Sequence, residues 1–227
     1  MSDAAAMSDA AALRDVPTGL AYPLPPEDRA RADLYALLAR LYAAGPDQAL
    51  LDAIAQAPAM GLPTLIEVPE SKAGLFGAAW DTLRAASSVM DQEAAAEEYV
   101  DLFIGVGKSE VNLHASHWLT GFMMEKPLAD VRATLAVLGL GRKDGVTMVE
   151  DHLSALLETM RLLVAGHDQR PPSPLSTQKE FFEQHLSPWV DKCFAAMGTH
   201  PIANYYRRVA EFTESYVALE RDSFVIG

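Results

Sequence analysis

Glu150, Asp151 and His152 place two carboxylates and an imidazole side by side, a combination that can carry acid–base chemistry. An acid–base pair of this kind usually serves a nucleophile, and no Gly-x-Ser-x-Gly pattern supplies one. The same residues also have a structural interpretation. Thr147 and Glu150 fit the capping box of a helix that starts at 147, and His152 falls on or beside its apolar stripe. We therefore predict cap and core roles here and no complete catalytic set.

His114 and His117 are three residues apart, so a helix would present both on one face, where they can bind a metal. A convincing metal site needs a third ligand. The other histidines are isolated in the sequence, and Cys193 has no second cysteine to join it. We therefore expect these histidines to form hydrogen bonds where a loop meets a helix, and we expect neither a metal nor another cofactor.

Residues 105–109 read Gly-Val-Gly-Lys-Ser and end like a P-loop, whose backbone N–H groups and lysine cradle phosphates. The full pattern needs a glycine where Leu102 stands and a strand before the loop, whereas 97–103 has helical spacing. The preferred interpretation is a glycine loop that ends a helix and exposes Lys108. A nucleotide-binding regulatory protein or enzyme that uses this loop is the alternative function, and a structural subunit bound permanently to one partner is a third.

Aromatic and apolar side chains gather in two stretches on either side of this loop. They are Tyr99, Leu102 and Phe103, and then Trp118, Phe122, Met123 and Met124. Methionine adapts well to apolar ligands of variable shape. Spacing alone does not separate a core from a groove, so both interpretations stay open for this set.

Apolar residues at helical spacing predict about eight helices, and no stretch alternates apolar and polar residues as a sheet would require. The expected helices cover residues 27–44, 47–57, 70–90, 91–103, 115–138, 147–165, 177–197 and 201–221. Loops are expected at 58–69 and 104–114. The helix at 115–138 is expected to bend near Pro127.

These helices are predicted to form one compact all-α domain over residues 27–227. Residues 1–26 are predicted to be a disordered tail, because they contain a duplicated Met-Ser-Asp-Ala-Ala and end in prolines. Within the domain, Thr177 with Glu180 fits a capping box. Pro201 fits the first turn of the last helix.

The composition favours a soluble cytoplasmic protein that attracts basic partners. The 227 residues are 50% hydrophobic, which is enough for a sizeable core. No apolar run reaches the roughly 18 residues that span a bilayer, and the start of the sequence lacks the pattern of a secretory signal. The single cysteine fits a reducing compartment. A net charge of −13 repels nucleic acid and anionic lipid and attracts basic segments.

Four segments together carry a family resemblance. Residues 98–107 contain Tyr-x-x-Leu-Phe ahead of a glycine loop, and Ser116 is followed by an aromatic residue at Trp118. Residues 151–153 read Asp-His-Leu, and 181–189 contain Phe-x-x-x-His-Leu-x-Pro-Trp. These segments resemble motifs of the TorD/DmsD family of molybdoenzyme maturation chaperones. The resemblance covers about residues 30–222.

The resemblance implies a cytoplasmic all-α chaperone that is not an enzyme. Its expected partner is the twin-arginine leader of a molybdenum-cofactor oxidoreductase. The chaperone is expected to hold the apo form of this enzyme until the cofactor is inserted and the precursor can be exported. Docking on the enzyme body is a further expected contact. Nucleic acid and stable membrane insertion are not expected, and a monomer and a dimer both stay open. Met148 and Val149 stand where the family often has Glu-Pro, which indicates a sub-branch with its own client.

A twin-arginine leader combines a basic start with a short apolar segment, so an acidic groove with apolar walls would suit it. The predicted peptide-binding residues are Tyr99, Leu102, Phe103, Ser116, Trp118, Glu150, Asp151 and His152. Asp151 and His152 are expected at the rim, as the anionic contact and the polar anchor. Three buried leucine-sized side chains contribute roughly 5–9 kcal/mol, from which the cost of ordering the peptide is subtracted. Charge must therefore supply part of the affinity, and binding should be sensitive to salt.

Overall fold

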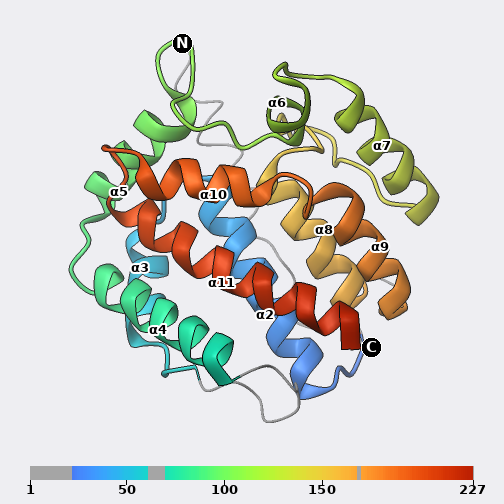
Figure 1. Cartoon of the computed structure of the whole chain (residues 1–227), viewed down its shortest axis with the longest axis horizontal. Helices are drawn as coiled ribbons and strands as arrows, with labels where there is room; N and C mark the ends of the chain where they lie inside the picture. Colours follow the sequence, from blue (N-terminus) through green and yellow to red (C-terminus); the bar gives the residue numbers. More distant parts are fainter. Residues whose placement is uncertain (1–21, 61–69, 168–169, 227) are drawn as a thin grey trace. The chain divides into compact units, whose positions relative to one another are not determined.

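The computed structural model describes residues 22–60, 70–167 and 170–226 (Figure 1). Within these ranges the chain forms ten α-helices and one π-helical segment, and extended pairing is confined to isolated bridges. The all-α prediction is therefore confirmed. The tail expected at 1–26 and the loop expected at 58–69 lie mostly outside the described residues. None of the described helices is long and apolar enough to cross a bilayer.

Packing divides the chain into two units, and each is described by itself. Among the described residues, unit 1 consists of 22–44, 113–167 and 170–189, and unit 2 consists of 45–60, 70–112 and 190–226. The described helices of unit 1 are α2 (Pro26–Ala43), α6 (Ala115–Thr120), α7 (Lys126–Leu138), α8 (Leu153–Ala165) and α9 (Leu175–His185). The prediction that residues 27–227 form one domain stays a prediction.

The core of unit 1 is built on the pairing of α2 with α8. Leu38 and Leu41 of α2 and Leu156 of α8 are fully buried, as the helical spacing predicts. The Ser154 hydroxyl donates a hydrogen bond of 2.7 Å to the carbonyl of Ala39, which fixes the two helices to each other. On the other side, α8 contacts α9, and α7 contacts both α6 and α9.

Unit 2 is also helical, and aromatic residues make up much of its core. Its described elements are α3 (Gln48–Gln56), α4 (Glu70–Ser87), α5 (Gln92–Tyr99), the π-helical segment η1 (Val100–Ile104), α10 (Val190–Thr199) and α11 (Tyr205–Ile226). Phe76 and Trp80 of α4 pack on Phe212 of α11 with ring centroids 5.3 and 5.0 Å away. The long helix α11 therefore organises this unit, with α4 and α10 packed on it.

The first turn of α11 is capped from a distant part of the chain. The carboxylate of Glu98 on α5 accepts hydrogen bonds of 2.8–3.0 Å from the backbone N–H groups of Asn204, Tyr205 and Tyr206. A negative group at the N-terminus of a helix accepts hydrogen bonds from the free backbone N–H groups and interacts favourably with the positive end of the helix dipole. Pro201 was predicted to lie in this first turn, and that prediction is wrong, because α11 begins only at Tyr205.

Two helices predicted as continuous are each broken in two, which explains ten helices instead of eight. Gly121 ends α6 with φ +83°, a left-handed conformation that favours glycine, and α7 then starts at Lys126 with Pro127 in its first turn. Pro188 lies between α9 and α10, where it has no N–H to continue a helix. The bend predicted near Pro127 is therefore a full interruption.

Both predicted capping boxes are wrong. The helix expected from 147 begins at Leu153, with His152 as the N-cap residue, so Thr147 does not start it. The helix expected from 177 begins at Leu175 after Pro174, which makes no side-chain cap. The N-cap residues are instead His152 for α8 and Pro174 for α9.

Candidate functional site

The N-terminus of α8 and the segment before α6 are joined by a short extended pairing in unit 1. His114 and His152 form an antiparallel bridge, in which the Ala115 N–H donates to the Asp151 carbonyl and the Leu153 N–H donates to the Leu113 carbonyl. The two imidazole rings meet edge to face with centroids 4.8 Å apart. This bridge brings two of the predicted chemical segments, 114–117 and 150–152, into one cluster.

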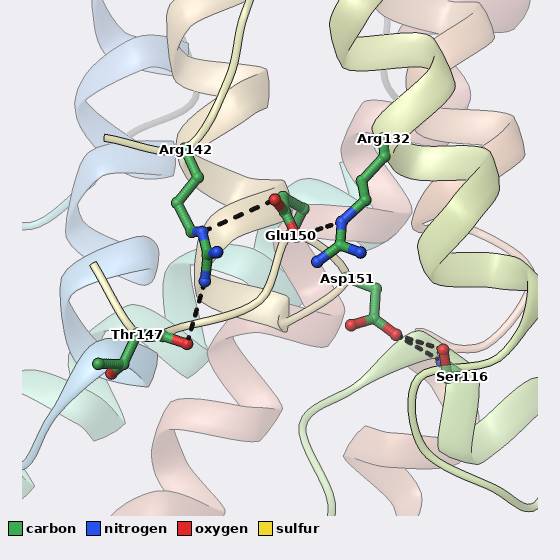
Figure 2. A network of polar contacts seen from close by, with 6 residues as sticks. All are labelled: Ser116, Arg132, Arg142, Thr147, Glu150 and Asp151. Atoms are coloured by element: carbon green, nitrogen blue, oxygen red, sulfur yellow. Dashed lines mark hydrogen bonds and ion pairs between the residues drawn. The ribbon is translucent and has the colours of Figure 1, made fainter. Parts of the chain in front are cut away.

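Asp151 and His152 are only 1% and 8% exposed, so the expectation that they lie at the rim of a groove is wrong. Figure 2 shows the Asp151 carboxylate directed at Ser116. Its Oδ2 atom accepts hydrogen bonds from the Ser116 N–H, at 3.0 Å, and from the Ser116 hydroxyl, at 2.6 Å. These bonds cap α6, whose N-cap residue His114 makes no side-chain cap bond of its own. The other carboxylate oxygen, Oδ1, is buried and has no hydrogen-bond partner in the described part of the chain. A buried acceptor without a partner carries a desolvation penalty that a donor from a ligand would relieve.

Glu150 is already held by two arginines of the same unit. Arg132 Nε lies 2.9 Å from Oε2, and Arg142 Nε lies 3.8 Å from Oε1 (Figure 2). Arg142 also reaches the Thr147 carbonyl at 3.5 Å, which ties the loop before α8 to the same group. The Glu150 side chain is 13% exposed, and both arginines are substantially exposed. A positively charged group from outside the chain would therefore compete with Arg132 and Arg142 for the Glu150 carboxylate.

His152 has a buried ring with a defined protonation state. Its Nδ1 accepts a 3.1 Å hydrogen bond from the Ser154 N–H, which caps α8. Burial, reinforced by the nearby His114, lowers the pKa of His152 to about 3. The ring is therefore neutral at physiological pH, with its proton on Nε2 because Nδ1 is the acceptor.

His114 shares this environment with less burial. Burial lowers its pKa, and the charge of Asp151 opposes that shift while His117 adds to it. The ring of His117 in turn meets Trp118 edge to face, with centroids 5.4 Å apart. Trp118 is half-buried, so the predicted aromatic wall on α6 keeps part of its surface accessible.

The remaining predicted residues belong to unit 2, where they form part of its core. Tyr99, Leu102 and Phe103 are 8%, 0% and 8% exposed. The Tyr206 ring lies 5.7 Å from that of Tyr99 and 4.9 Å from that of Phe103, between centroids. Burial also raises the pKa of Tyr99. The eight predicted residues thus divide into three in unit 2 and five in unit 1.

The loop at 105–109 lacks the setting of a P-loop. It follows α5 and the π-helical segment η1 instead of a strand. Gly105 has φ +62°, and its N–H donates to the Val100 carbonyl, so it closes the π-helical turn. A side chain at Gly105 would also collide with the Lys108 carbonyl. Gly105 is therefore required for two reasons, its positive φ and the lack of space for a side chain, and both belong to a tight turn that ends a helix.

Sequence reasoning missed a cavity of about 590 Å³ in unit 1. The residues that line it come from α6, α7, the end of α9 and the turn after α9, and include Leu119, Pro127, Val131, Thr134, His185 and Pro188. Four of the lining residues lie in the Phe-x-x-x-His-Leu-x-Pro-Trp segment that carries the family resemblance: Glu183, Gln184, His185 and Pro188. That motif is the sequence signal for this cavity.

The fold and these sites define an all-helical protein with a cavity of about 590 Å³, whose lining includes Ala115, the neighbour in the chain of the buried Ser116. Among the described residues, no group of three or more His, Cys, Asp or Glu side chains is placed to hold a metal ion. The family model described as nitrate reductase delta subunit matches residues 70–195, which is more than half of the chain. The chain therefore belongs to this family of TorD-type molybdoenzyme maturation chaperones, as its motifs indicated. A search of curated proteins found no match.

Proposed function

We propose that this chain is a cytoplasmic, system-specific chaperone that binds the twin-arginine leader of a molybdoenzyme precursor. It holds the apo precursor until the cofactor is inserted and export can begin. The observation that carries the proposal is the buried Asp151 carboxylate, whose Oδ1 has no hydrogen-bond partner in the described part of this family member. A guanidinium group offers donors that fit a carboxylate and stays charged at any physiological pH.

The charge of the chain supports a basic partner. The net charge is −13, and a twin-arginine leader is cationic at its start. Electrostatic attraction between the two speeds encounter and weakens as salt is added, because charges more than a Debye length apart are screened. The apolar part of the leader needs a separate surface, since charge alone does not select a hydrophobic segment.

Glu150 supports the same partner in a different way. Its two ion pairs are with arginines that are 50% and 39% exposed, and ion pairs with that exposure contribute at most about 1 kcal/mol each. An incoming arginine can therefore replace either one at little cost. In the proposed complex, Glu150 exchanges an internal arginine for one of the leader, while Asp151 contributes its second carboxylate oxygen.

Ser116, Trp118 and His152 complete the proposed contact set in unit 1. Ser116 keeps Asp151 oriented, Trp118 offers an accessible aromatic face, and neutral His152 offers an Nε2–H donor to a peptide carbonyl. Contact of the leader with Tyr99, Leu102 and Phe103 stays a prediction.

Calorimetric titration tests the proposal with a synthetic peptide that carries an Arg-Arg pair followed by a leucine-rich segment, and with a Lys-Lys version of the same peptide. The expected result is binding of the Arg-Arg peptide and weaker binding of the Lys-Lys peptide, because lysine lacks the planar fork of donors. Equal affinity for both would remove the arginine-specific role of Asp151. No binding of either would overturn the proposed function.

A further inference from the structure

The cavity of unit 1 combines an apolar interior with an acidic edge. Its volume of about 590 Å³ lies within the range of ligand-binding pockets, roughly 300–1,000 Å³. Ala115, Leu119, Pro127, Val131 and Pro188 supply its apolar surface. The charged residues in the lining are both acidic, Asp130 and Glu183. Each pairs with an exposed lysine one turn earlier in its own helix, Lys126 with Asp130 at 2.5 Å and Lys179 with Glu183 at 4.0 Å. Exposed ion pairs of this kind are weak, so a positive group of a ligand can replace either lysine. A ligand that fits this cavity is therefore apolar along most of its length and carries a positive group that displaces Lys126 or Lys179.

The segment that joins α6 to α7 is unusually apolar for a surface. Phe122, Met123 and Met124 are 69%, 41% and 72% exposed. They stand in the chain between Leu119 and Pro127, both of which line the cavity. A contiguous exposed run of large apolar side chains is uncommon on a protein that works alone and marks a surface that is covered by a partner. The sequence left this run open as core or groove, and its exposure excludes the core.

The backbone of this segment is held in a defined shape. The Thr120 hydroxyl donates to the Ser116 carbonyl at 2.8 Å, and it accepts the Phe122 N–H at 3.2 Å. Met124 has φ +59°, a left-handed conformation that is costly for a residue with a side chain. The turn therefore presents its apolar side chains on a constrained scaffold, which limits the ordering needed when a ligand binds.

Two of the lining residues, His185 and Thr134, form a polar contact. His185 Nε2 and the Thr134 hydroxyl are 2.9 Å apart and form a hydrogen bond. Burial lowers the pKa of His185, with the charge of Asp130 opposing the shift, so the ring does not place a fixed cation in the cavity. The preference of the cavity for a positive group therefore depends on the displacement of Lys126 from Asp130 or of Lys179 from Glu183.

From these features we propose that the cavity and the Phe122–Met124 turn together bind the apolar segment of the leader, with Asp130 and Glu183 facing its positively charged end. This inference rests on the proposed function and adds the place where the hydrophobic part of the leader lies. The set is separate from the eight residues predicted from the sequence, although Ala115 and Leu119 share the short helix α6 with Ser116 and Trp118. Helix α6 thus contributes to both the charged and the apolar contacts.

Two tryptophan substitutions on α7 separate the cavity from its surroundings. Ala133 is exposed and lines the cavity, so Ala133→Trp fills space without entering the core. Ala136 is exposed on the same helix and does not line the cavity, so Ala136→Trp is the matched control. The probes are the synthetic Arg-Arg peptide with a leucine-rich segment and a version with serines in place of the leucines.

Ala133→Trp is expected to weaken binding of the leucine peptide by about tenfold or more and to leave the weaker serine peptide unchanged, while Ala136→Trp leaves both as in the wild type. Equal affinity of wild type and Ala133→Trp for the leucine peptide would overturn the cavity inference and leave the proposed function standing. If the wild type bound neither peptide, the proposed function and this inference would both fall.

A photo-crosslinking experiment on the unmodified chain does not depend on a folded variant. The leucine peptide carries a benzophenone amino acid in its apolar segment, and mass spectrometry locates the adduct. Adducts within 119–134 or 183–188 support the inference, and adducts confined to other segments overturn it.

Sedimentation at rising protein concentration tests whether a second copy of the chain occupies the cavity instead. Self-association that Ala133→Trp abolishes and the leucine peptide does not displace would assign the cavity to a second copy of the chain.

Discussion

Ser116 donates two hydrogen bonds to one oxygen of Asp151, from its backbone N–H at 3.0 Å and from its hydroxyl at 2.6 Å. The two residues are 35 positions apart in the sequence, and both are buried. The pair does for α6 what a local N-cap normally does, and it also fixes the direction of the carboxylate. The same contact therefore has a structural role and, in the proposed complex, a binding role.

Removal of the Ser116 hydroxyl should destabilise unit 1. Ser116→Ala deletes a buried hydrogen bond to a charged acceptor, which costs about 1.5–3 kcal/mol of unfolding free energy. Urea denaturation followed by circular dichroism measures it. Ser88→Ala, which removes an exposed hydroxyl bonded to a backbone carbonyl, is the control and should change stability little. An unchanged unfolding midpoint for Ser116→Ala would show that the short Oγ–Oδ2 contact does not stabilise the fold.

Release of Glu150 from its internal partner should favour a cationic ligand. Arg132→Gln removes the closer of its two arginines, so affinity for the Arg-Arg peptide is expected to rise by about two- to fivefold, which is the scale of a partly exposed ion pair. Titration calorimetry at low salt gives the comparison. Arg84→Gln, which breaks an ion pair with Asp81 in unit 2, should have no effect. A fall in affinity for Arg132→Gln would mean that Arg132 itself contacts the peptide.

Stability should fall as the solution becomes acidic, with His152 as one cause. Burial, with His114 adding to it, lowers the pKa of His152 from 6.5 to about 3 in the folded chain. Between these two values the unfolded chain binds the extra proton and the folded chain does not, so unfolding free energy decreases as pH falls through this window. The slope from this one residue is at most about 1.4 kcal/mol per pH unit.

Denaturation curves test how steeply the unfolding free energy depends on pH. They are measured at several pH values between 4 and 7, a window set roughly by this pKa shift. His152→Asn retains an N-cap acceptor for the Ser154 N–H and removes the titrating ring, so it should show a shallower dependence on pH. His200→Asn is the matched control, because His200 accepts a similar bond from the N–H two residues later. The same slope for His152→Asn and the wild type would assign the acid sensitivity to other groups.

The carboxylate of Glu98 should stabilise unit 2 through the first turn of α11. Glu98→Ala leaves three backbone N–H groups without their acceptor and is expected to cost about 1–2 kcal/mol. Thermal and urea unfolding report the loss. Glu97→Ala changes an exposed neighbour by the same atoms and the same charge, so it should be nearly neutral. Equal effects from the two substitutions would point to net charge as the cause and not to capping.

Helix interiors were predictable from sequence because they depend on local periodicity. The apolar stripe from Leu153 to Val164 is buried as its spacing requires. The start of that helix was not predictable, because the preceding loop is held by Arg132 and by the bridge to His114, which are distant in sequence. A capping-box pattern carries no information about such contacts.

The local sequence pattern also did not predict which aromatic residues are buried. Phe103 and Phe122 stand in similarly apolar stretches, yet Phe103 is 8% exposed and Phe122 is 69% exposed. Phe103 packs on Tyr206, more than a hundred residues further along, whereas Phe122 follows the glycine that ends α6. The family motifs located the polar cluster, but the cavity depends on how α6, α7 and α9 meet in space.

The charge role of Asp151 is the central claim, and one titration tests it most directly. Affinity for the Arg-Arg peptide is measured at low and at high salt for the wild type, Asp151→Asn and Asp144→Asn. The asparagine at 151 can still accept the Ser116 bonds, and Asp144 is an exposed acid of the same unit that serves as control for net charge. We predict that Asp151→Asn loses about tenfold or more at low salt and much of its salt dependence, while Asp144→Asn behaves like the wild type. Wild-type affinity and salt dependence for Asp151→Asn would contradict the account.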